Sequence, residues 1–176
     1  MMTNWKIATP KNLKIGIVNS EIKIYLVLDI LPKRLHMNRK RFYISGLVGG
    51  VASFFGGYLI YGVLFAKVLA ENAGSAIGVS KSPEQMVWWA LILGSLFMSL
   101  TLSYIFNKWS KVNNMFDGAA DGAFISFLIA AGYDFTMYGN ANLYTLKGTL
   151  IDLVAATCMG IITGAVVGWM NGRLEK

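Results

Sequence analysis

The distribution of apolar and polar positions divides most of the chain into four long apolar runs separated by short polar segments. The runs cover residues 43–66, 86–106, 118–139 and 148–170, so each contains between 21 and 24 residues. A helix needs about 20 apolar residues to cross a hydrocarbon core that is ~30 Å thick. A segment in lipid must also satisfy its own backbone hydrogen bonds, which a helix does. The pattern therefore predicts an all-α, integral membrane four-helix bundle.

The composition supports the same fold class. Hydrophobic residues make up 55% of the chain and charged residues 14%, and the mean hydropathy is +0.52. Soluble domains are typically about 25% charged. We therefore expect a multi-pass protein in contact with the lipid bilayer rather than a soluble globular protein.

Basic residues are concentrated near the start of the chain. Residues 1–42 hold nine of the 16 Lys and Arg residues but only two of the nine acidic residues, so this tail accounts for the net charge of +7. It precedes a four-span domain, residues 43–176. An even number of spans places both termini on one side, and the excess of basic residues there predicts that this side is the cytoplasm. We expect no nucleic-acid partner, because no recognition motif accompanies the charge.

The tail itself has two interpretations. Met37 begins the stretch MNRKRFYISGL, in which a short basic segment runs directly into the first apolar run, as at a natural start. Residues 1–36 are then either an upstream extension of the gene or a functional part of the protein. Removing them leaves the predicted orientation unchanged, since Arg39, Lys40 and Arg41 remain on the cytoplasmic side.

Small residues recur every four positions in three of the runs. In lipid, such rows allow helices to approach closely, and hydroxyl groups in them can form interhelical hydrogen bonds. One interpretation is packing within a single bundle, and the alternative is an interface with a second copy or another membrane protein. The rows are Ala156, Gly160, Gly164 and Gly168; Gly46 and Gly50 beside Gly49, Ser53 and Gly57; and Ser95, Ser99 and Ser103.

Two aspartates lie inside the last two runs, Asp134 and Asp152. A carboxylate inside a bilayer is costly, so it usually faces the bundle interior or a wet cavity. The short connection makes the two helices antiparallel neighbours, which places both carboxyls at similar depth. If they face each other, repulsion and desolvation favour a proton on one of them, as proton-coupled transport would require. Alternatively, each lies in the membrane interface, hydrated or paired with Lys147.

Tyr58 and Tyr61 lie one turn apart in the first run and complete the candidate polar site. They either form hydrogen bonds with Asp134 or Asp152 across the bundle, or are interfacial aromatic residues. The residues alone leave both interpretations open.

The sequence lacks the signatures of an enzyme. It contains no G-x-S-x-G, Walker, HExxH or Rossmann motif. The single histidine, His36, and the single cysteine, Cys158, exclude a His/Cys metal cluster. We therefore expect no catalytic residues, no cofactor and no bound metal.

Two stretches together resemble a known family: GGYLIYGVLFAKVLAENAG and LKGTLIDLVAATCMGIITGAVVGWM. They are similar to small bacterial four-helix membrane proteins of domain-of-unknown-function family seventeen sixty-one. The resemblance covers roughly residues 44–170 and departs at Ile60-Tyr61, where the family often has Trp-Tyr. It implies four helices in a bacterial cytoplasmic membrane and no particular activity.

Two functions follow as hypotheses. The leading one is a non-enzymatic, self-associating bundle with an interaction or accessory role. The alternative is a small transporter or channel, proton-coupled through Asp134 and Asp152. A closed bundle with lipid-facing glycines would favour association, whereas a polar cavity lined by these carboxyls and by tyrosines would favour transport.

Overall fold

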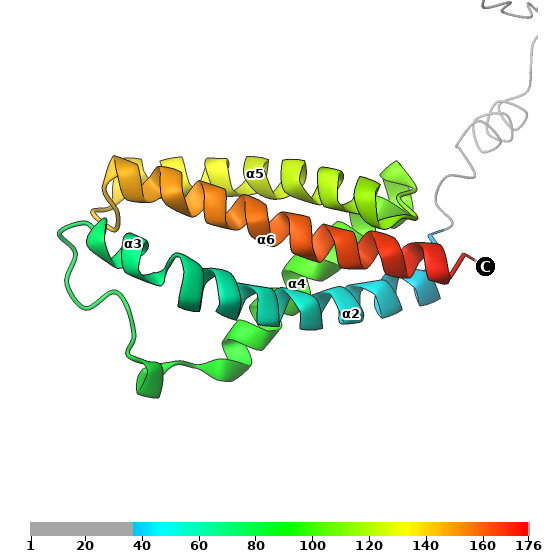
Figure 1. The fold of residues 1–176 in the computed structure, drawn as a ribbon, viewed down its shortest axis with the longest axis horizontal. Helices are drawn as coiled ribbons and strands as arrows, with labels where there is room; N and C mark the ends of the chain where they lie inside the picture. The colour runs from blue at the N-terminus through cyan, green and yellow to red at the C-terminus, as the bar shows by residue number, and fades with distance from the viewer. Residues whose placement is uncertain (1–36, 176) are drawn as a thin grey trace, which may run out of the picture. The chain divides into compact units, whose positions relative to one another are not determined.

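Residues 37–175, the part of the chain that the computed structural model describes, form an all-α bundle of four long helices (Figure 1). The helices are α2 (Arg39–Gly57), α4 (Trp88–Ile105), α5 (Met115–Asn140) and α6 (Leu146–Arg173). Each overlaps one predicted span, which confirms the predicted all-α bundle of four apolar helices. The two interpretations of residues 1–36 lie outside the described residues.

Shorter elements extend or connect the long helices. A π-helical segment, Tyr58–Leu64, follows α2, and a second, Phe106–Ser110, follows α4. The short helix α3 (Ala66–Glu71) and a 3₁₀ turn, Pro83–Gln85, lie between them. We call the end of the bundle at which α2 begins and α6 ends the terminal end, and the opposite end, which carries α3, the loop end.

The four helices are long and apolar enough to cross a membrane. With their π-helical extensions they contain 23 to 28 residues. At 1.5 Å per residue the shortest is ~34 Å long, more than the ~30 Å of a hydrocarbon core. By length and composition, the chain is therefore a small polytopic membrane protein.

The distribution of side chains agrees with a lipid environment. Small polar residues such as Ser45, Ser99 and Thr163 are fully or almost fully buried, whereas large apolar residues such as Val51 and Phe55 are exposed. Burial of apolar surface drives folding in water, but it gives no such drive between helices surrounded by lipid tails. The exposed apolar surface therefore contacts the bilayer, and the interior is held by close packing and hydrogen bonds.

The closest helix contact joins α5 to α6 through glycines. A Cβ atom on Gly164 would lie 2.8 Å from the Cα atom of Gly122, and one on Gly168 would lie 2.9 Å from the Cα atom of Gly118. Gly160 is equally close to α5, where it meets the backbone of Gly122. The α6 ridge is thus covered by α5 of the same chain, so a second copy cannot use it as a dimer interface.

Helix α2 packs against α4 through the predicted Gly46 and Gly50 row. A Cβ atom on Gly50 would lie 3.2 Å from the Cα atom of Leu96, and Gly46 faces Leu100 in the same way. Hydroxyl groups add to this contact, because the Oγ atoms of Ser45 and Ser103 lie 2.8 Å apart. Helix α4 makes far less contact with α5 and α6, and its first turns lie away from both (Figure 1).

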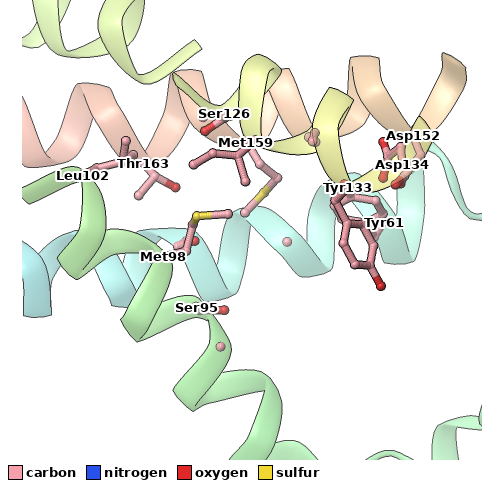
Figure 2. Close-up of a pocket in the computed structure, with 17 residues that line it drawn as sticks. Tyr61, Ser95, Met98, Leu102, Ser126, Tyr133, Asp134, Asp152, Met159 and Thr163 are labelled. Carbon is pink, nitrogen blue, oxygen red and sulfur yellow. The ribbon is translucent and has the colours of Figure 1, made fainter. Parts of the chain in front are cut away.

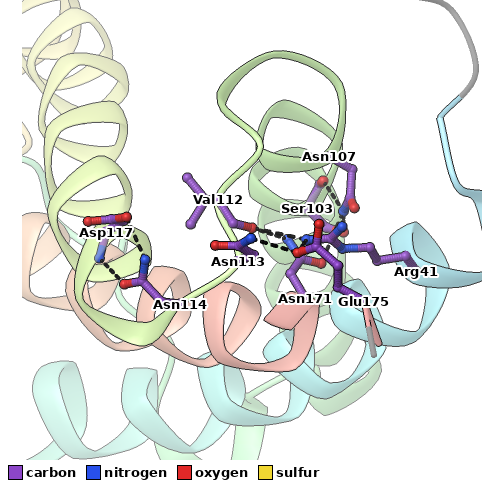
Figure 3. Close-up of polar contacts among 9 residues, drawn as sticks. All are labelled: Arg41, Ser103, Asn107, Val112, Asn113, Asn114, Asp117, Asn171 and Glu175. Carbon is purple, nitrogen blue, oxygen red and sulfur yellow. Dashed lines mark hydrogen bonds and ion pairs between the residues drawn. The ribbon is translucent and has the colours of Figure 1, made fainter. Parts of the chain in front are cut away.

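A polar network joins the helices at the terminal end (Figure 3). The fully buried Asn171 of α6 donates a hydrogen bond to the backbone oxygen of Val112 at 3.0 Å and accepts one from Asn107 at 3.2 Å. Beside it, Arg41 of α2 forms an ion pair with Glu175 at 3.6 Å. The network therefore joins α2, the segment between α4 and α5, and the end of α6 to one another.

We expect Asn171→Leu to lower the free energy of unfolding by about 1–3 kcal/mol, because it removes two hydrogen bonds of a buried side chain and leaves the Val112 oxygen with only the longer contact from Arg41 at 3.5 Å. Thermal and denaturant unfolding in detergent would measure the change. Asn140→Leu, at an exposed position on α5, is the control and should leave stability unchanged. Equal stability of the two variants would mean that the network contributes little.

A candidate binding site between the four helices

The loop-end half of the bundle contains a cavity of about 390 Å³ that one face of each long helix lines (Figure 2). Its walls combine small residues, two methionines, tyrosines and two carboxyl groups. The cavity is not fully enclosed, because Met98, Ile129 and Tyr133 line it and are also exposed on the bundle surface. Its lining residues are Ser53, Gly57, Tyr61, Gly94, Ser95, Met98, Leu102, Ser126, Ile129, Ala130, Tyr133, Asp134, Asp152, Ala156, Met159, Gly160 and Thr163.

Helix α2 contributes residues at four-residue spacing. Ser53, Gly57 and Tyr61 follow one another along a single face that points into the cavity. Tyr61 lies in the π-helical segment, and such segments are frequent at functional sites because they change the direction of side chains within a helix. Ser53 and Gly57 are small and leave open space beside them, and Tyr61 lies at the edge of that space.

The two intramembrane carboxyl groups meet at the loop end of this cavity. Asp134 of α5 and Asp152 of α6 lie side by side (Figure 2). Asp134 is only 8% exposed, and no hydrogen-bond donor from residues 37–175 reaches its buried Oδ2 atom. A buried carboxylate oxygen without a donor is unfavourable, so the site is suited to a proton or to a cationic group of a ligand.

Basic side chains of the described residues form no ion pair with these carboxyls. The ion pairs among residues 37–175 are Arg41–Glu175 and Lys67–Glu71. The predicted alternative of a pair with Lys147 is therefore wrong for both Asp134 and Asp152. In the part of the chain that the structure describes, neither cavity that they line contains a Lys, Arg or His side chain.

A second cavity of about 210 Å³ lies beyond the carboxyls, nearer the loop end. It shares Tyr133, Asp134 and Asp152 with the first cavity and also reaches Tyr144. Burial and the negative charges of Asp152 and Asp134 raise the pKa of the Tyr144 phenol. The carboxyls thus border both cavities, and their charge acts on the connection between α5 and α6.

The opposite end of the first cavity is closed. Leu102 forms part of its wall and belongs to a buried cluster with Phe106, Val112 and Val167. Between the cavity and the terminal end, α5 and α6 are in backbone contact at Gly118 and Gly164. The space therefore does not continue to the terminal end.

The structure brings together three of the four residues of the predicted polar site. Asp134, Asp152 and Tyr61 line the same cavity, and Tyr61 lies beside Asp152. Tyr58 does not join them, since its side chain is 63% exposed on the outside of the bundle. The prediction that Tyr58 takes part in the site is therefore wrong. A π-turn holds more residues than an α-turn, so two tyrosines three positions apart no longer share a face.

Sequence reasoning did not identify Tyr133, Met98 and Met159 as part of the site. Tyr133 directly precedes Asp134, but adjacent helical positions do not normally share a face, and the large residue gave no sign of pointing inwards. Met98 and Met159 lie in apolar runs that contain many similar residues. Ser95 was recognised only as part of a packing row, although it lines the cavity.

The predicted packing residues have two roles. Gly46 and Gly50 contact α4, while Gly160, Gly164 and Gly168 contact α5. Ala156 lies outside this contact and lines the cavity instead, one turn from Asp152. Within residues 37–175, no group of three or more His, Cys, Asp or Glu side chains is placed to hold a metal ion.

The chain was compared with protein-family models, with curated proteins and with solved structures. No family model matches the chain, so the resemblance drawn from two stretches of the sequence stays a prediction. No curated protein and no solved structure matches it either.

Proposed function

We propose that this protein is a small, non-enzymatic membrane transporter that binds a solute in the cavity of the loop-end half and exchanges it for protons at Asp134 and Asp152. The observation that carries the proposal is the cavity of about 390 Å³ whose end is formed by these two adjacent carboxyls. Ionisable residues inside a membrane domain are costly and are typical of ion and proton pathways.

The groups that face the carboxyls support proton exchange. They are Tyr61 from the segment after α2, Tyr133 from α5 and Tyr144 from the connection before α6, and no titratable residue of α4 lines either cavity. These tyrosines can donate hydrogen bonds but carry no positive charge at neutral pH. A proton or a bound solute is therefore the group that compensates the negative charge.

Helix α4 is the element suited to change access to this cavity. It is joined to α2 along the Gly46 and Gly50 row and is fixed at the terminal end by Asn107. Its loop-end half has few neighbours: residues 88–94 are all exposed, and Gly94 has no atom within 4 Å of its Cβ position. Movement of this half towards α5 would close the cavity around a solute, as alternating access requires.

A transporter is favoured over a self-associating bundle for a specific reason. The strongest small-residue ridge, on α6, is used within the chain, whereas the cavity has no structural role that would explain two carboxyls in its wall. Self-association through another surface and the absence of enzymatic activity both stay predictions.

Asp134→Asn should abolish solute-driven proton movement across the membrane. Full-length protein would be reconstituted into vesicles that contain a pH-sensitive dye, and gradients of small cationic, neutral and anionic organic solutes would be applied. We expect at least one class to change the internal pH with wild-type protein. The change should disappear with Asp134→Asn, because exchange is proposed to need both carboxyls and one of them is lost.

Asp121→Asn is the matched control, because Asp121 is a half-buried acid on the same helix that lines neither cavity. It should transport like the wild type. The proposal fails if folded wild-type protein moves no protons with any solute class, or if the Asp134 and Asp121 variants behave alike.

We also propose that the protein lies in a bacterial cytoplasmic membrane with both termini in the cytoplasm. The seven basic residues that flank the spans at the terminal end, against three at the loop end, support this orientation. A reporter fused after Glu175 should therefore show cytoplasmic activity. A reporter that is active only in the periplasm would reverse the orientation and place the loop end on the cytoplasmic side.

A further inference from the structure

We infer that the cavity takes an amphipathic monovalent organic cation, meaning an amine or quaternary ammonium group attached to an apolar body. This inference rests on the proposed function and names the solute class of the same site. It follows from three properties of the cavity: the charge at its end, the apolar character of its walls and the side from which it opens.

The charge requirement comes from Asp134 and Asp152. Asp134 lines the cavity, and its Oδ2 atom is buried and lacks a hydrogen-bond donor among residues 37–175. No Lys, Arg or His of residues 37–175 lines this space, so within this part of the chain two acidic groups meet without a fixed counter-charge. An anionic solute would add to the repulsion, and a neutral one would leave it uncompensated. A cation removes it.

The walls favour an organic cation over a metal ion. Hard cations such as Ca²⁺ and Mg²⁺ are held by six or more oxygen ligands, many of them water. Away from the carboxyls, the apolar side chains of Met98, Leu102, Ile129 and Met159 share the wall with a few hydroxyl groups, those of Ser53, Ser95, Ser126 and Thr163, and with no further carboxylate. Its volume of about 390 Å³ lies within the ~300–1,000 Å³ typical of small-molecule sites. Methionine side chains adapt to apolar groups of different shape.

Two aromatic rings lie at the charged end. Tyr61 and Tyr133 lie next to Asp134 and Asp152 in Figure 2. The face of a tyrosine ring attracts a nearby cation, and quaternary ammonium groups are commonly held by aromatic rings. Carboxyls and rings together therefore favour an alkylated ammonium group over a strongly hydrated inorganic ion.

The opening lies at membrane depth. Met98, Ile129 and Tyr133 line the cavity and are also exposed on the bundle surface, within segments long enough to span the bilayer. A solute that dissolves partly in lipid can therefore reach the carboxyls from the side. Its apolar body would occupy the methionine-lined part while its charge rests against Asp134.

Binding of benzyltrimethylammonium to full-length protein in lipid nanodiscs, measured by calorimetry, tests the inference. Its neutral isostere is neopentylbenzene, in which a carbon atom replaces the charged nitrogen. We expect saturable binding of the cation only. Affinity should fall at least about tenfold in Asp134→Asn and in Asp152→Asn, and less in Tyr61→Leu, which removes a ring but no charge. Asp121→Asn should bind like the wild type.

Three outcomes would overturn the inference: equal binding of the neutral isostere, unchanged affinity in both aspartate variants, or binding of Mg²⁺ or Ca²⁺ in place of the organic cation. They differ from failure of the proposed function. Proton movement that depends on Asp134 with a neutral or anionic solute would keep the transporter and reject this solute class. Cation binding without proton movement for any solute would keep the site and reject transport.

Discussion

Gly164→Leu is expected to disrupt the packing of α5 against α6 and to destabilise the whole bundle. A Cβ atom at this position would lie 2.8 Å from the Cα atom of Gly122 and would overlap the backbone oxygen of Gly118. Both obstacles are backbone atoms, so no side chain can rotate out of the way, and α5 must move. Overpacking of a close contact lowers the free energy of unfolding by about 3 kcal/mol when the surrounding atoms cannot move apart easily. Thermal unfolding in detergent should show a large loss of stability.

The same substitution at Gly132 of α5 provides the control. No atom lies within 4 Å of a Cβ at Gly132, which is exposed on the bundle surface. Gly132→Leu should therefore be neutral or slightly stabilising, because leucine favours a helix more than glycine does. If the two variants unfold at the same temperature, α5 and α6 do not pack through their glycines. Oligomer size should change in neither variant, since the α6 ridge contacts α5 of the same chain.

Ala156→Phe is expected to block the site while leaving the bundle folded. Ala156 lines the cavity one turn from Asp152 and takes no part in the glycine contact. A phenyl ring there would occupy the space in which the apolar part of a solute is proposed to lie. The rate of solute-driven proton movement in vesicles should fall at least about tenfold. Such a fall corresponds to a rise of about 1.4 kcal/mol in the activation free energy. The unfolding temperature should stay close to that of the wild type, because the ring enters open space.

Val154→Phe is the control for this substitution. Val154 lies two residues earlier on α6, is 53% exposed and does not line the cavity. Its added ring would point towards lipid and should leave transport unchanged. Full activity in Ala156→Phe would show that the solute does not pass through this cavity. Equal loss in both variants would indicate a general defect of α6.

The existence and order of the four helices could be predicted because the constraint is simple. A segment that spans the bilayer must be apolar and about 20 residues long, and its backbone N–H and C=O groups must form hydrogen bonds with one another. The positions of Asp134 and Asp152 near the facing ends of consecutive spans also follow from chain order, since a short connection forces the two helices to be antiparallel neighbours. The sequence therefore allowed the prediction that the carboxyls of Asp134 and Asp152 face each other, as one of two alternatives for these residues.

The pairing of helix faces could not be predicted in the same way. Glycine rows occur on several helices, and a single sequence does not state which rows meet. The α6 row was visible, but its partners Gly118 and Gly122 were not recognised, because one GxxxG pair is a weak signal. Likewise, the π-helical segment that separates Tyr58 from Tyr61 depends on packing between helices rather than on local preference.

The cavity could be predicted least of all. It exists because α4 contacts α2 closely but diverges from α5 and α6 towards the loop end. Divergence of one helix is a property of the whole bundle, and no residue of α4 encodes it alone. Once the arrangement is known, the small residues Ser53, Gly57 and Gly94 are seen to leave space rather than to permit contact.

Proton release on solute binding tests the central claim most directly, because the claim is that solute and protons share the same two carboxyls. Benzyltrimethylammonium would be added to full-length protein in weakly buffered detergent solution across about pH 4–7, the range around the titration of carboxyl groups, and a pH-sensitive dye would report released protons. We predict release from the wild type and from Asp121→Asn, and none from the Asp134→Asn, Asp152→Asn double variant. Binding without proton release throughout this range, or equal release from the double variant, would contradict the account.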